Sequence, residues 1–258
     1  MIDRVGIITG ASSGIGKSTA ITLASILGMR LVLSGRNKSE LIQVQNEVNK
    51  IAGKEISEIV VGDISDKQTV GNCIQKCKDT WDINPCFFIA SAGRGLPGTL
   101  ISSNEEEWGS LINTNVIGLM HQLKAVSQSM IESTEVSHDF VSKPRDIVVI
   151  GSSIGRNVSP FNSVYGSTKF ATHGLTEALR RELGPKGIRV TLIEPGLVET
   201  NFQKNAGYDM QWFKDYVEEV GPALVSDDIA KTIQFSIQLP GNVHLDNISI
   251  RPTRQSYP

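Results

Sequence analysis

The sequence predicts an α/β fold in which one doubly wound domain holds a seven-stranded parallel sheet with helices on both faces. Two observations support this prediction. Short apolar runs alternate with helical patterns from the first residues onward. Parallel neighbours require helical crossovers of this kind, and helices on both faces bury the sheet. The 258 residues, of which 40% are hydrophobic, contain no linker that would separate two domains, so we expect one domain over residues 1–258.

The strands are expected at seven short apolar runs. Runs of this length, bounded by glycine or polar residues, are typical of strands that are buried on both faces. In chain order they are VGIIT (5–9), LVLS (31–34), EIVVGD (58–63), CFFIAS (86–91), DIVVIG (146–151), RVTLIE (189–194) and residues 243–250.

Helices are expected where apolar residues recur with helical spacing. The ranges are 14–28, 39–53, 66–81, 104–133, 163–183 and 226–239, and the longest of them predicts one helix with a bend. Two segments lack a clear pattern. We expect residues 133–145 to form a surface loop ended by Pro144. We expect residues 197–222 to form a substrate-binding lid, because long patternless segments in compact domains are usually functional or mobile.

Composition excludes several classes of protein. A net charge of −2 predicts neither a nucleic-acid surface nor an anionic-membrane surface. No apolar run reaches the length of a membrane span, and the start MIDRVGIITG leads directly into a strand without the features of a signal peptide. The three cysteines Cys73, Cys77 and Cys86 are an odd number, which predicts reduced thiols in a cytoplasmic protein and no metal site.

The segment TGASSGIG (9–16) joins the first expected strand to the first expected helix. Its glycines let the backbone turn tightly and approach a phosphate, while the helix N-terminus offers N–H groups and the positive end of a dipole. An ordinary strand–helix turn would also fit, but a position at the first βα junction favours dinucleotide binding. The residues expected to bind are Gly10, Ser12, Ser13, Gly14, Ile15 and Gly16.

The second strand ends in Ser34-Gly35-Arg36-Asn37, where an NAD-selective site would need an acidic residue for the ribose hydroxyls. Arg36 can instead pair with a 2′-phosphate and stack on adenine. A solvated arginine in a turn is the alternative interpretation. We therefore predict NADP as the cofactor, with NADPH preferred over NADH and with Arg36 and Asn37 at its adenosine end.

Tyr165 and Lys169 lie one helical turn apart in SVYGSTKFATHG (163–174) and share one helix face. The pKa of a free tyrosine is about 10, and a cation one turn away is expected to lower it towards that of a useful acid/base. Ser152 follows the fifth strand, at the edge where ligands bind, and offers a hydroxyl to a substrate carbonyl. Because Y-x-x-x-K patterns often occur by chance, this pattern alone does not identify an enzyme.

Several motifs occur in an order that resembles the short-chain dehydrogenases/reductases over nearly the whole chain. They are TGASSGIG, Asp63, SAG at 91–93, Asn115, Ser152, YGSTK and PGLVET (195–200). The resemblance implies a Rossmann-fold, NAD(P)-dependent oxidoreductase that forms a homo-oligomer, a tetramer or a dimer, and moves hydride and a proton between a carbonyl and an alcohol. Tyr165 would match the acid/base, and Lys169 the residue that lowers its pKa and binds the nicotinamide ribose.

The resemblance also implies roles for other residues. Ser152 is similar to the serine that polarises the carbonyl, and Asn115 to an asparagine that holds a proton-relay water. The remaining cofactor contacts would be Asp63 and Ile64 beside the adenine, Ser91, Ala92 and Gly93 after the fourth strand, and Pro195, Gly196, Val198 and Thr200 at the nicotinamide carboxamide. Ala90-Ser91 stands where the family has two asparagines, so the backbone and ribose contacts made there must differ.

The end of the chain, with IEPGLVETNF and LPGNVHLDNISIRPTRQ, resembles the branch of NADP-dependent 3-hydroxy acid and serine dehydrogenases. This implies a 3-hydroxy acid or a small carbonyl compound as the substrate. Arg94 and Arg156 are candidate clamps for a substrate carboxylate, and each also fits a solvated loop arginine. Four aromatic residues fit either a lid or a subunit contact: Phe202, Tyr208, Trp212 and Phe213. A non-catalytic dinucleotide sensor is the alternative function, but it would not need all four catalytic candidates together.

Overall fold

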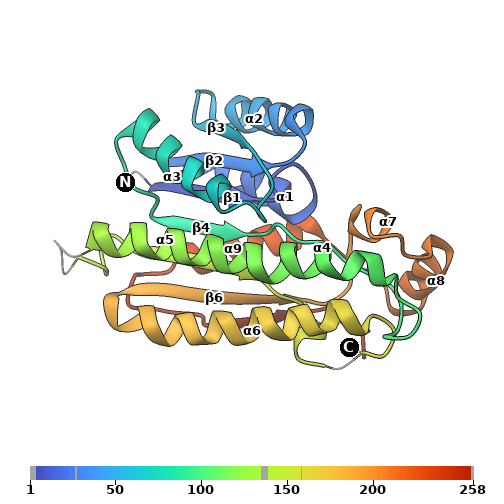
Figure 1. The fold of residues 1–258 in the computed structure, drawn as a ribbon. Helices are drawn as coiled ribbons and strands as arrows, with labels where there is room; N and C mark the ends of the chain where they lie inside the picture. The colour runs from blue at the N-terminus through green and yellow to red at the C-terminus, as the bar shows by residue number, and fades with distance from the viewer. Residues whose placement is uncertain (1–3, 27, 135–138, 158, 257–258) are drawn as a thin grey trace.

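Seven parallel strands form the central sheet (Figure 1). The computed structural model describes residues 4–26, 28–134, 139–157 and 159–256. The strands lie in the order β3 (Ser57–Val61), β2 (Met29–Gly35), β1 (Arg4–Thr9), β4 (Phe87–Ala90), β5 (Arg145–Ile150), β6 (Ile188–Pro195) and β9 (Asn247–Ile250). Every neighbouring pair is parallel. The predicted doubly wound fold with a seven-stranded parallel sheet is therefore confirmed.

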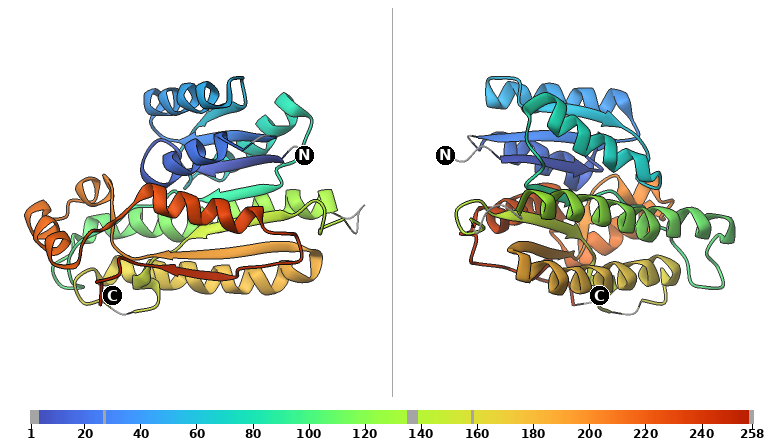
Figure 2. Two further views of the ribbon diagram at one scale, coloured as in Figure 1. Left: turned by 180° about the vertical axis from the view of Figure 1, so that it is seen from behind. Right: turned by 60° about the vertical axis from the view of Figure 1, so that its left-hand side comes forward.

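Helices cover both faces of the sheet, which Figures 1 and 2 show from opposite sides. One face carries α1 (Gly14–Ala24), α2 (Lys38–Ala52) and α9 (Ser226–Gln238). The other carries α3 (Lys67–Trp81), α5 (Leu119–Thr134) and α6 (Ser163–Leu183). Each face has its own hydrophobic core, with Leu23 and Ile233 on one side and Val126 and Leu183 on the other. Burial on both faces explains why the strands read as continuous apolar runs.

Local signals set most helix ends close to their predicted places. α2 starts after Asn37, whose side chain accepts a hydrogen bond from the Glu40 N–H, and it stops at Gly53, which has a φ of 67°. α6 has the predicted bounds. α1 ends at Ala24, earlier than predicted, and the chain then turns back towards β2.

The long helical pattern at 104–133 is divided. It contains η1 (Glu105–Glu107), α4 (Trp108–Ile112), a π-helical turn η2 (Asn113–Gly118) and α5. The predicted bend is thus a π-helical turn, a feature that often marks functional sites. The last strand covers only part of the predicted range 243–250. Residues 135–138 of the predicted surface loop, and Leu27 of the first predicted helix, lie outside the described residues.

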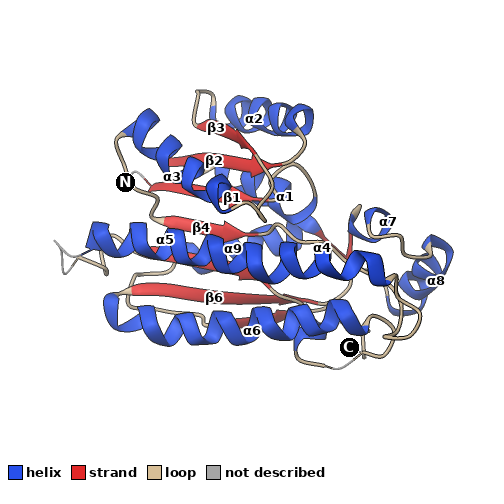
Figure 3. Ribbon diagram, viewed as in Figure 1, coloured by secondary structure: helices blue, strands red, loops and turns tan. Residues whose placement is uncertain are grey.

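Residues 197–222, where the sequence shows no clear pattern, form regular structure in several places. They contain α7 (Phe202–Asn205) and α8 (Met210–Val220), and β7 (Val198–Glu199) pairs with β8 (Leu224–Val225), as Figure 3 shows for the helices. α8 buries Phe213 and Val220 and exposes most of its other residues, and its apolar residues Met210, Phe213, Val217 and Val220 do recur at helical spacing. Both helices lie beyond the carboxyl ends of the strands (Figure 1).

A buried group of charges joins the amino ends of three strands. Asp146 on β5 is 2% exposed and accepts hydrogen bonds from Arg4 on β1 at 2.5 Å and from Arg189 on β6 at 2.7 Å. Both guanidinium groups also donate to the carbonyl oxygen of Ile237 near the end of α9. One carboxylate thereby fixes two cations and, through them, the last turn of a helix.

Asp146→Asn is expected to lower the free energy of unfolding by about 3 to 5 kcal/mol, because two buried guanidinium groups lose the charge that compensates them. Urea unfolding followed by circular dichroism measures this loss. Asp227→Asn is the matched control: Asp227 pairs with Lys231 at the surface, where solvent screens the charges and the loss should be far smaller. Similar losses in the two variants would contradict the prediction.

Candidate active site

A large cavity of about 690 Å³ opens at the carboxyl ends of the strands. It includes the point where β1 and β4 lie side by side, with Thr9 paired to Ala90, and where the connections leave in opposite directions. Ligands bind at this point in doubly wound sheets. The predicted residues in its wall are Gly10, Ser12, Ser13, Gly14, Ile15, Arg36, Asp63, Ile64, Ser91, Ala92, Gly93, Arg94, Ser152, Tyr165, Lys169, Pro195, Gly196, Val198 and Thr200. The predicted residues outside the wall are Gly16, Asn37, Asn115 and Arg156.

Two glycines of the loop at 9–16 have different structural roles. Gly10 has a φ of 67°, and a Cβ there would lie 2.8 Å from the backbone of Ala92, so the loop contacts the segment after β4 directly. A Cβ at Gly16 would lie 2.4 Å from the carbonyl oxygen of Gly10, so this glycine lets α1 pack on the loop rather than contact a ligand. The Ser13 side chain does not cap α1, which leaves the first N–H groups of the helix available. This cradle fits the pyrophosphate of a dinucleotide.

Arg36 stands at the end of β2, with a side chain that is 76% exposed. Its guanidinium lies 3.7 Å from the carboxylate of Asp63. Partial burial raises the pKa of Asp63, but hydrogen bonds from Ser65 and the charge of Arg36 outweigh burial, so the pKa lies below its usual value. The anionic Asp63 thus attracts the long Arg36 side chain and keeps its guanidinium near the cavity. Asn37 does not reach the cavity; its side-chain oxygen accepts hydrogen bonds from Ser39 and Glu40 at the start of α2.

Asn115 is buried in the π-helical turn, and its side chain is engaged on both sides. Oδ1 accepts a hydrogen bond from the Arg94 N–H at 2.9 Å, while Nδ2 donates to the Arg94 carbonyl at 2.9 Å and to the Thr168 hydroxyl at 3.1 Å. The side chain therefore ties the segment after β4 to α6. Its neighbour Thr114 lines the cavity instead. Whether a water is held near Asn115 stays a prediction.

Tyr165, Lys169 and Ser152 come together between α6 and the end of β5. Tyr165 and Lys169 are 7% and 9% exposed. The Lys169 ammonium donates to the carbonyl of Ile150 at 2.9 Å and lies 5.8 Å from the centroid of the Tyr165 ring. The Ser152 hydroxyl hydrogen-bonds with the Tyr165 phenol and also accepts a hydrogen bond from the N–H of Ile154. The structure thus assembles the three residues that the sequence predicted to act together.

Burial controls the charges of this group. It raises the pKa of Tyr165; the nearby phenol of Tyr208 adds to the rise, and the hydrogen bond with Ser152 opposes it. Burial also lowers the pKa of Lys169 to about 8. The lowering of the Tyr165 pKa that the sequence suggested is therefore not what this structure shows, because removal from water raises that pKa and only the hydrogen bond with Ser152 acts against the rise. At neutral pH the phenol keeps its proton and the lysine is mostly charged.

Aromatic residues of the segment 197–222 line the cavity near Tyr165. The ring centroid of Phe202 lies 5.9 Å from that of Tyr165, and Trp212 stacks on Tyr216 with centroids 5.5 Å apart. Apart from Tyr165, the aromatic residues in the wall are Phe161, Phe202, Tyr208, Trp212, Phe213 and Tyr216. Their place in the wall favours the lid interpretation over a subunit contact.

Gln255 also lines the cavity, and sequence reasoning missed it. Its side chain packs against Gly196, where a Cβ would lie 2.4 Å from its oxygen, and it accepts a hydrogen bond from the Leu197 N–H at 2.9 Å. The C-terminal segment therefore positions the Pro195-Gly196 turn. No motif or periodicity marks this residue, because the contact joins distant parts of the chain.

The two candidate carboxylate clamps already have glutamate partners. Arg94 lines the cavity, but its guanidinium binds Glu107 and the Ser110 hydroxyl. Arg156 lies outside this cavity and makes two hydrogen bonds, of 2.9 and 2.7 Å, with the buried Glu194. Because both guanidinium groups are paired, these contacts do not support a clamp on the substrate.

The described residues offer neither a grouped set of metal ligands nor a membrane-spanning helix. Within the described ranges, no three or more His, Cys, Asp or Glu side chains are grouped so as to hold a metal ion. Cys73 and Cys77 are buried, and burial raises the pKa of Cys73 to about 12, which makes it an inert thiol. In the part of the chain that the structure describes, no helix combines the length and apolarity that crossing a bilayer requires.

Comparisons with known proteins agree with this geometry. Residues 4–211 match the family model described as short chain dehydrogenase. An uncharacterized oxidoreductase of Staphylococcus saprophyticus is 31% identical over 252 residues, which cover 97% of each chain. The closed form of a serine dehydrogenase complexed with NADP+ has a TM-score of 0.85 and 24% identity, over 98% of this chain and 97% of its own. An alcohol dehydrogenase from the archaeon Thermococcus sibiricus, complexed with 5-hydroxy-NADP, has a TM-score of 0.82 and 25% identity over 100% of both chains.

The family match begins at the first described strand and includes the glycine loop, Ser152, Tyr165, Lys169 and the Pro195-Gly196 turn. The curated relative and the two structures extend the likeness over nearly the entire chain. The chain therefore belongs to the short-chain dehydrogenase family of oxidoreductases.

Proposed function

We propose that this protein is an NADP-dependent oxidoreductase that interconverts a carbonyl compound and a secondary alcohol, with Tyr165 as the acid/base. The observation that carries the proposal is the buried pair of Tyr165 and Lys169 beside Ser152, in a cavity that also contains the glycine loop. Burying a phenol beside an ammonium group is costly, and such perturbed groups cluster at sites of chemistry. A protein that only sensed a dinucleotide would have no need of them, which favours the enzyme over the sensor.

Each of the three side chains has a distinct task in this mechanism. Ser152 and Tyr165 hold the substrate oxygen between their hydroxyl groups, and Tyr165, protonated at neutral pH, donates its proton to a carbonyl oxygen. The nicotinamide of the cofactor, when bound, supplies or accepts the hydride. Lys169, still charged at neutral pH, stabilises the negative charge left on Tyr165. In the opposite direction the phenolate takes the proton of the alcohol.

NADP is favoured over NAD by the residues at the end of β2. Arg36 offers an exposed guanidinium beside the cavity, and position 35, where an acid would contact the ribose, is a glycine. Two of the similar structures carry NADP+ and 5-hydroxy-NADP. Arg36 would pair with the 2′-phosphate, and the glycine loop would hold the pyrophosphate.

A small neutral carbonyl compound is the substrate that the cavity favours. Its wall near Tyr165 is aromatic. Arg94 also lines the cavity, but its guanidinium is already paired with the carboxylate of Glu107. A 3-hydroxy acid would have to displace this glutamate.

Assembly into a homotetramer or dimer and a cytoplasmic location stay predictions from the sequence. Four apolar side chains on the outer side of the helices that cover one face are 39 to 43% exposed, which is consistent with a covered surface: Ile112, Ile117, Met120 and Phe170.

Tyr165→Phe is expected to reduce kcat by about 10²- to 10⁴-fold, because the ring stays packed but the transferable proton is lost. NADPH oxidation with a small neutral ketone measures kcat, and calorimetric titration should give nearly unchanged NADPH affinity. Tyr208→Phe, which removes a second phenol from the same wall, is the control and should keep most activity. If Tyr165→Phe kept more than about a tenth of wild-type kcat, the proposed role would be refuted.

NADPH is expected to bind at least about tenfold more tightly than NADH, and Arg36→Ala should remove most of this preference. Both cofactors are titrated into the wild type and the variant, and the ratio of the two Kd values is compared. Lys38→Ala removes another exposed cation close by and should leave the ratio unchanged. Equal affinities in the wild type would contradict NADP selectivity.

The methyl ester of a 3-oxo acid is expected to have a higher kcat/KM than the free acid, because Arg94 is already paired with Glu107. The two substrates are compared in the wild type and in Glu107→Gln, which releases the arginine. The acid should improve in the variant relative to the ester. A wild-type preference for the acid would show that a carboxylate clamp exists.

A further inference from the structure

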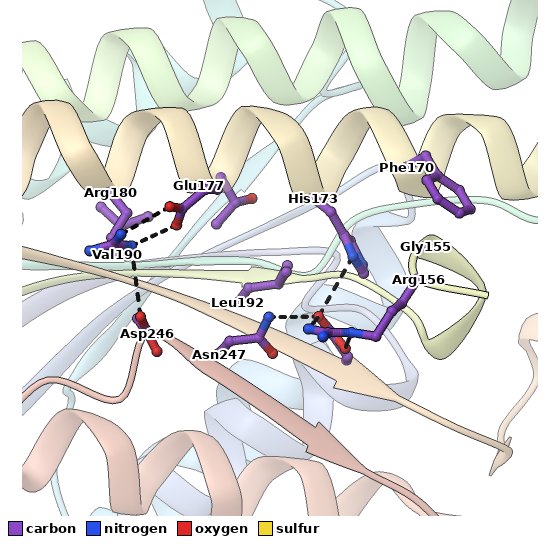
Figure 4. A pocket seen from close by; sticks show the side chains of 12 residues that line it. Gly155, Arg156, Phe170, His173, Glu177, Arg180, Val190, Leu192, Asp246 and Asn247 are labelled. Atoms are coloured by element: carbon purple, nitrogen blue, oxygen red, sulfur yellow. Dashed lines mark hydrogen bonds and ion pairs between the residues drawn. The ribbon is translucent and has the colours of Figure 1, made fainter.

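A second group of polar side chains lies behind Ser152, on the side away from the large cavity. It lines a separate pocket of about 400 Å³ between α6 and the strands β6 and β9. Figure 4 shows three side chains that point towards one place: His173 from α6, Arg156 from the loop after β5, and Asn247 from β9. The carboxylate at that place is Glu194, the residue before Pro195. The mechanism above does not use this group.

His173 contacts the backbone of Ser152 directly. The Ser152 N–H donates a hydrogen bond to Nε2 of His173 at 3.3 Å. The two flanking glycines make room for the ring: a Cβ at Gly151 would lie 2.6 Å from Nε2, and one at Gly155 would lie 2.3 Å from it. The turn that carries the Ser152 hydroxyl therefore packs directly against the imidazole, and side chains at the two glycine positions would clash with it.

The hydrogen bond fixes the tautomer of the ring. Since Nε2 accepts the Ser152 N–H, the ring proton of neutral His173 must be on Nδ1. Nδ1 lies 3.6 Å from Oε1 of Glu194, whose side chain is fully buried. A carboxylate there favours the tautomer with its proton on Nδ1, as carboxylates beside other functional histidines do.

Glu194 is itself held as an anion. Burial raises its pKa, but hydrogen bonds from Arg156 and Asn247 outweigh burial, so the pKa lies below its usual value. Asn247 Nδ2 donates to Oε1 at 2.7 Å, and the Arg156 guanidinium binds both oxygens. The carboxylate thus has fixed partners from two other parts of the chain.

We propose that His173 is a positioning residue, which holds the Ser152 backbone in the geometry that the reaction needs, with Glu194 fixing its tautomer. This inference rests on the proposed function of Ser152. Tyr165, Lys169 and His173 follow one another at intervals of four residues on α6, so one helix face supplies the acid/base, its cation and the support of the serine. Glu194 directly precedes the Pro195-Gly196 turn in the cavity wall, so the residue that orients His173 is also joined to the part of the wall proposed to contact the cofactor.

The proposal has a pH consequence. Protonation of His173 would place a proton on Nε2, facing the Ser152 N–H, and the acceptor would be lost. The charged groups around the ring are Glu194 on β6, Lys169 on α6 and Arg156 after the turn. Burial, together with the two cations, lowers the pKa of His173 despite Glu194. Turnover should therefore fall only at a pH below the ordinary histidine value of about 6.5.

Three substitutions at His173 separate its two contacts. His173→Leu removes both contacts at similar volume. His173→Asn carries its amide only about as far as Nδ1, so it can keep the contact with Glu194 but not the one with Ser152. His173→Gln carries an oxygen about as far as Nε2, so it can still accept the Ser152 N–H. If His173 only filled space, the Gln variant would have no reason to be closer to wild type than the Asn variant.

The experiment measures two independent quantities for each variant. Hydrogen exchange of the Ser152 amide, followed by NMR on the protein alone, reports the hydrogen bond without any turnover. It should accelerate about tenfold or more in the Leu and Asn variants and stay near wild type in Gln. NADPH oxidation with the neutral ketone should show kcat reduced about tenfold in Leu and Asn, within about threefold of wild type in Gln, and NADPH Kd unchanged within about twofold. The acid-side loss of activity should disappear in Gln.

The outcomes separate the two proposals. Unchanged exchange and kcat in His173→Leu, or a Gln variant as impaired as Leu, would overturn the positioning role. A wild type without turnover on any carbonyl compound would refute the proposed function instead, while the exchange measurement would still decide whether His173 holds Ser152.

Discussion

The seven strands of the central sheet run in one direction, and the site depends on this constraint. Each crossover must return to the opposite edge, so every strand delivers its following residues to the same edge of the sheet. The glycine loop, Asp63, the segment after β4, Ser152 and the Pro195-Gly196 turn are all strand-end segments of this kind. Residues spread over most of the chain therefore line one cavity without any long-range motif to bring them together.

This constraint explains what the sequence could predict. The strands and most helices follow from apolar runs and end signals such as Gly53, and the strand-end motifs then predict most of the cavity wall. Gly16 and Asn37, predicted as cofactor contacts, lie outside the cavity wall and take part in packing and helix capping. Gln255 has no local signal, because its contacts join distant parts of the chain. In segment 197–222 the signal for α8 is present, since Phe213, Val217 and Val220 recur at helical spacing, but it is short and does not figure among the helices predicted from the sequence.

Electrostatics could be predicted least well. The spacing of Tyr165 and Lys169 correctly indicates a pair on one helix face, but a spacing contains no information on depth, and depth determines the direction of the Tyr165 pKa. The same holds for Arg94 and Arg156: their positions after strands were clear, whereas their glutamate partners come from elsewhere in the fold. Which charged groups pair with each other depends on the tertiary structure, and a single sequence reveals a pair only when its members lie one helical turn apart.

The buried charges around Asp146 lie at the amino ends of the strands, whereas the cavity lies at the carboxyl ends. An anchor of the fold and the site of chemistry are thus separated by the length of the sheet. Substitutions in the segment 197–222 can accumulate without disturbing this anchor, since losses at well-separated positions are roughly additive. Such an arrangement lets the descendants of one scaffold acquire new substrates by drift at one end while the other end preserves foldability.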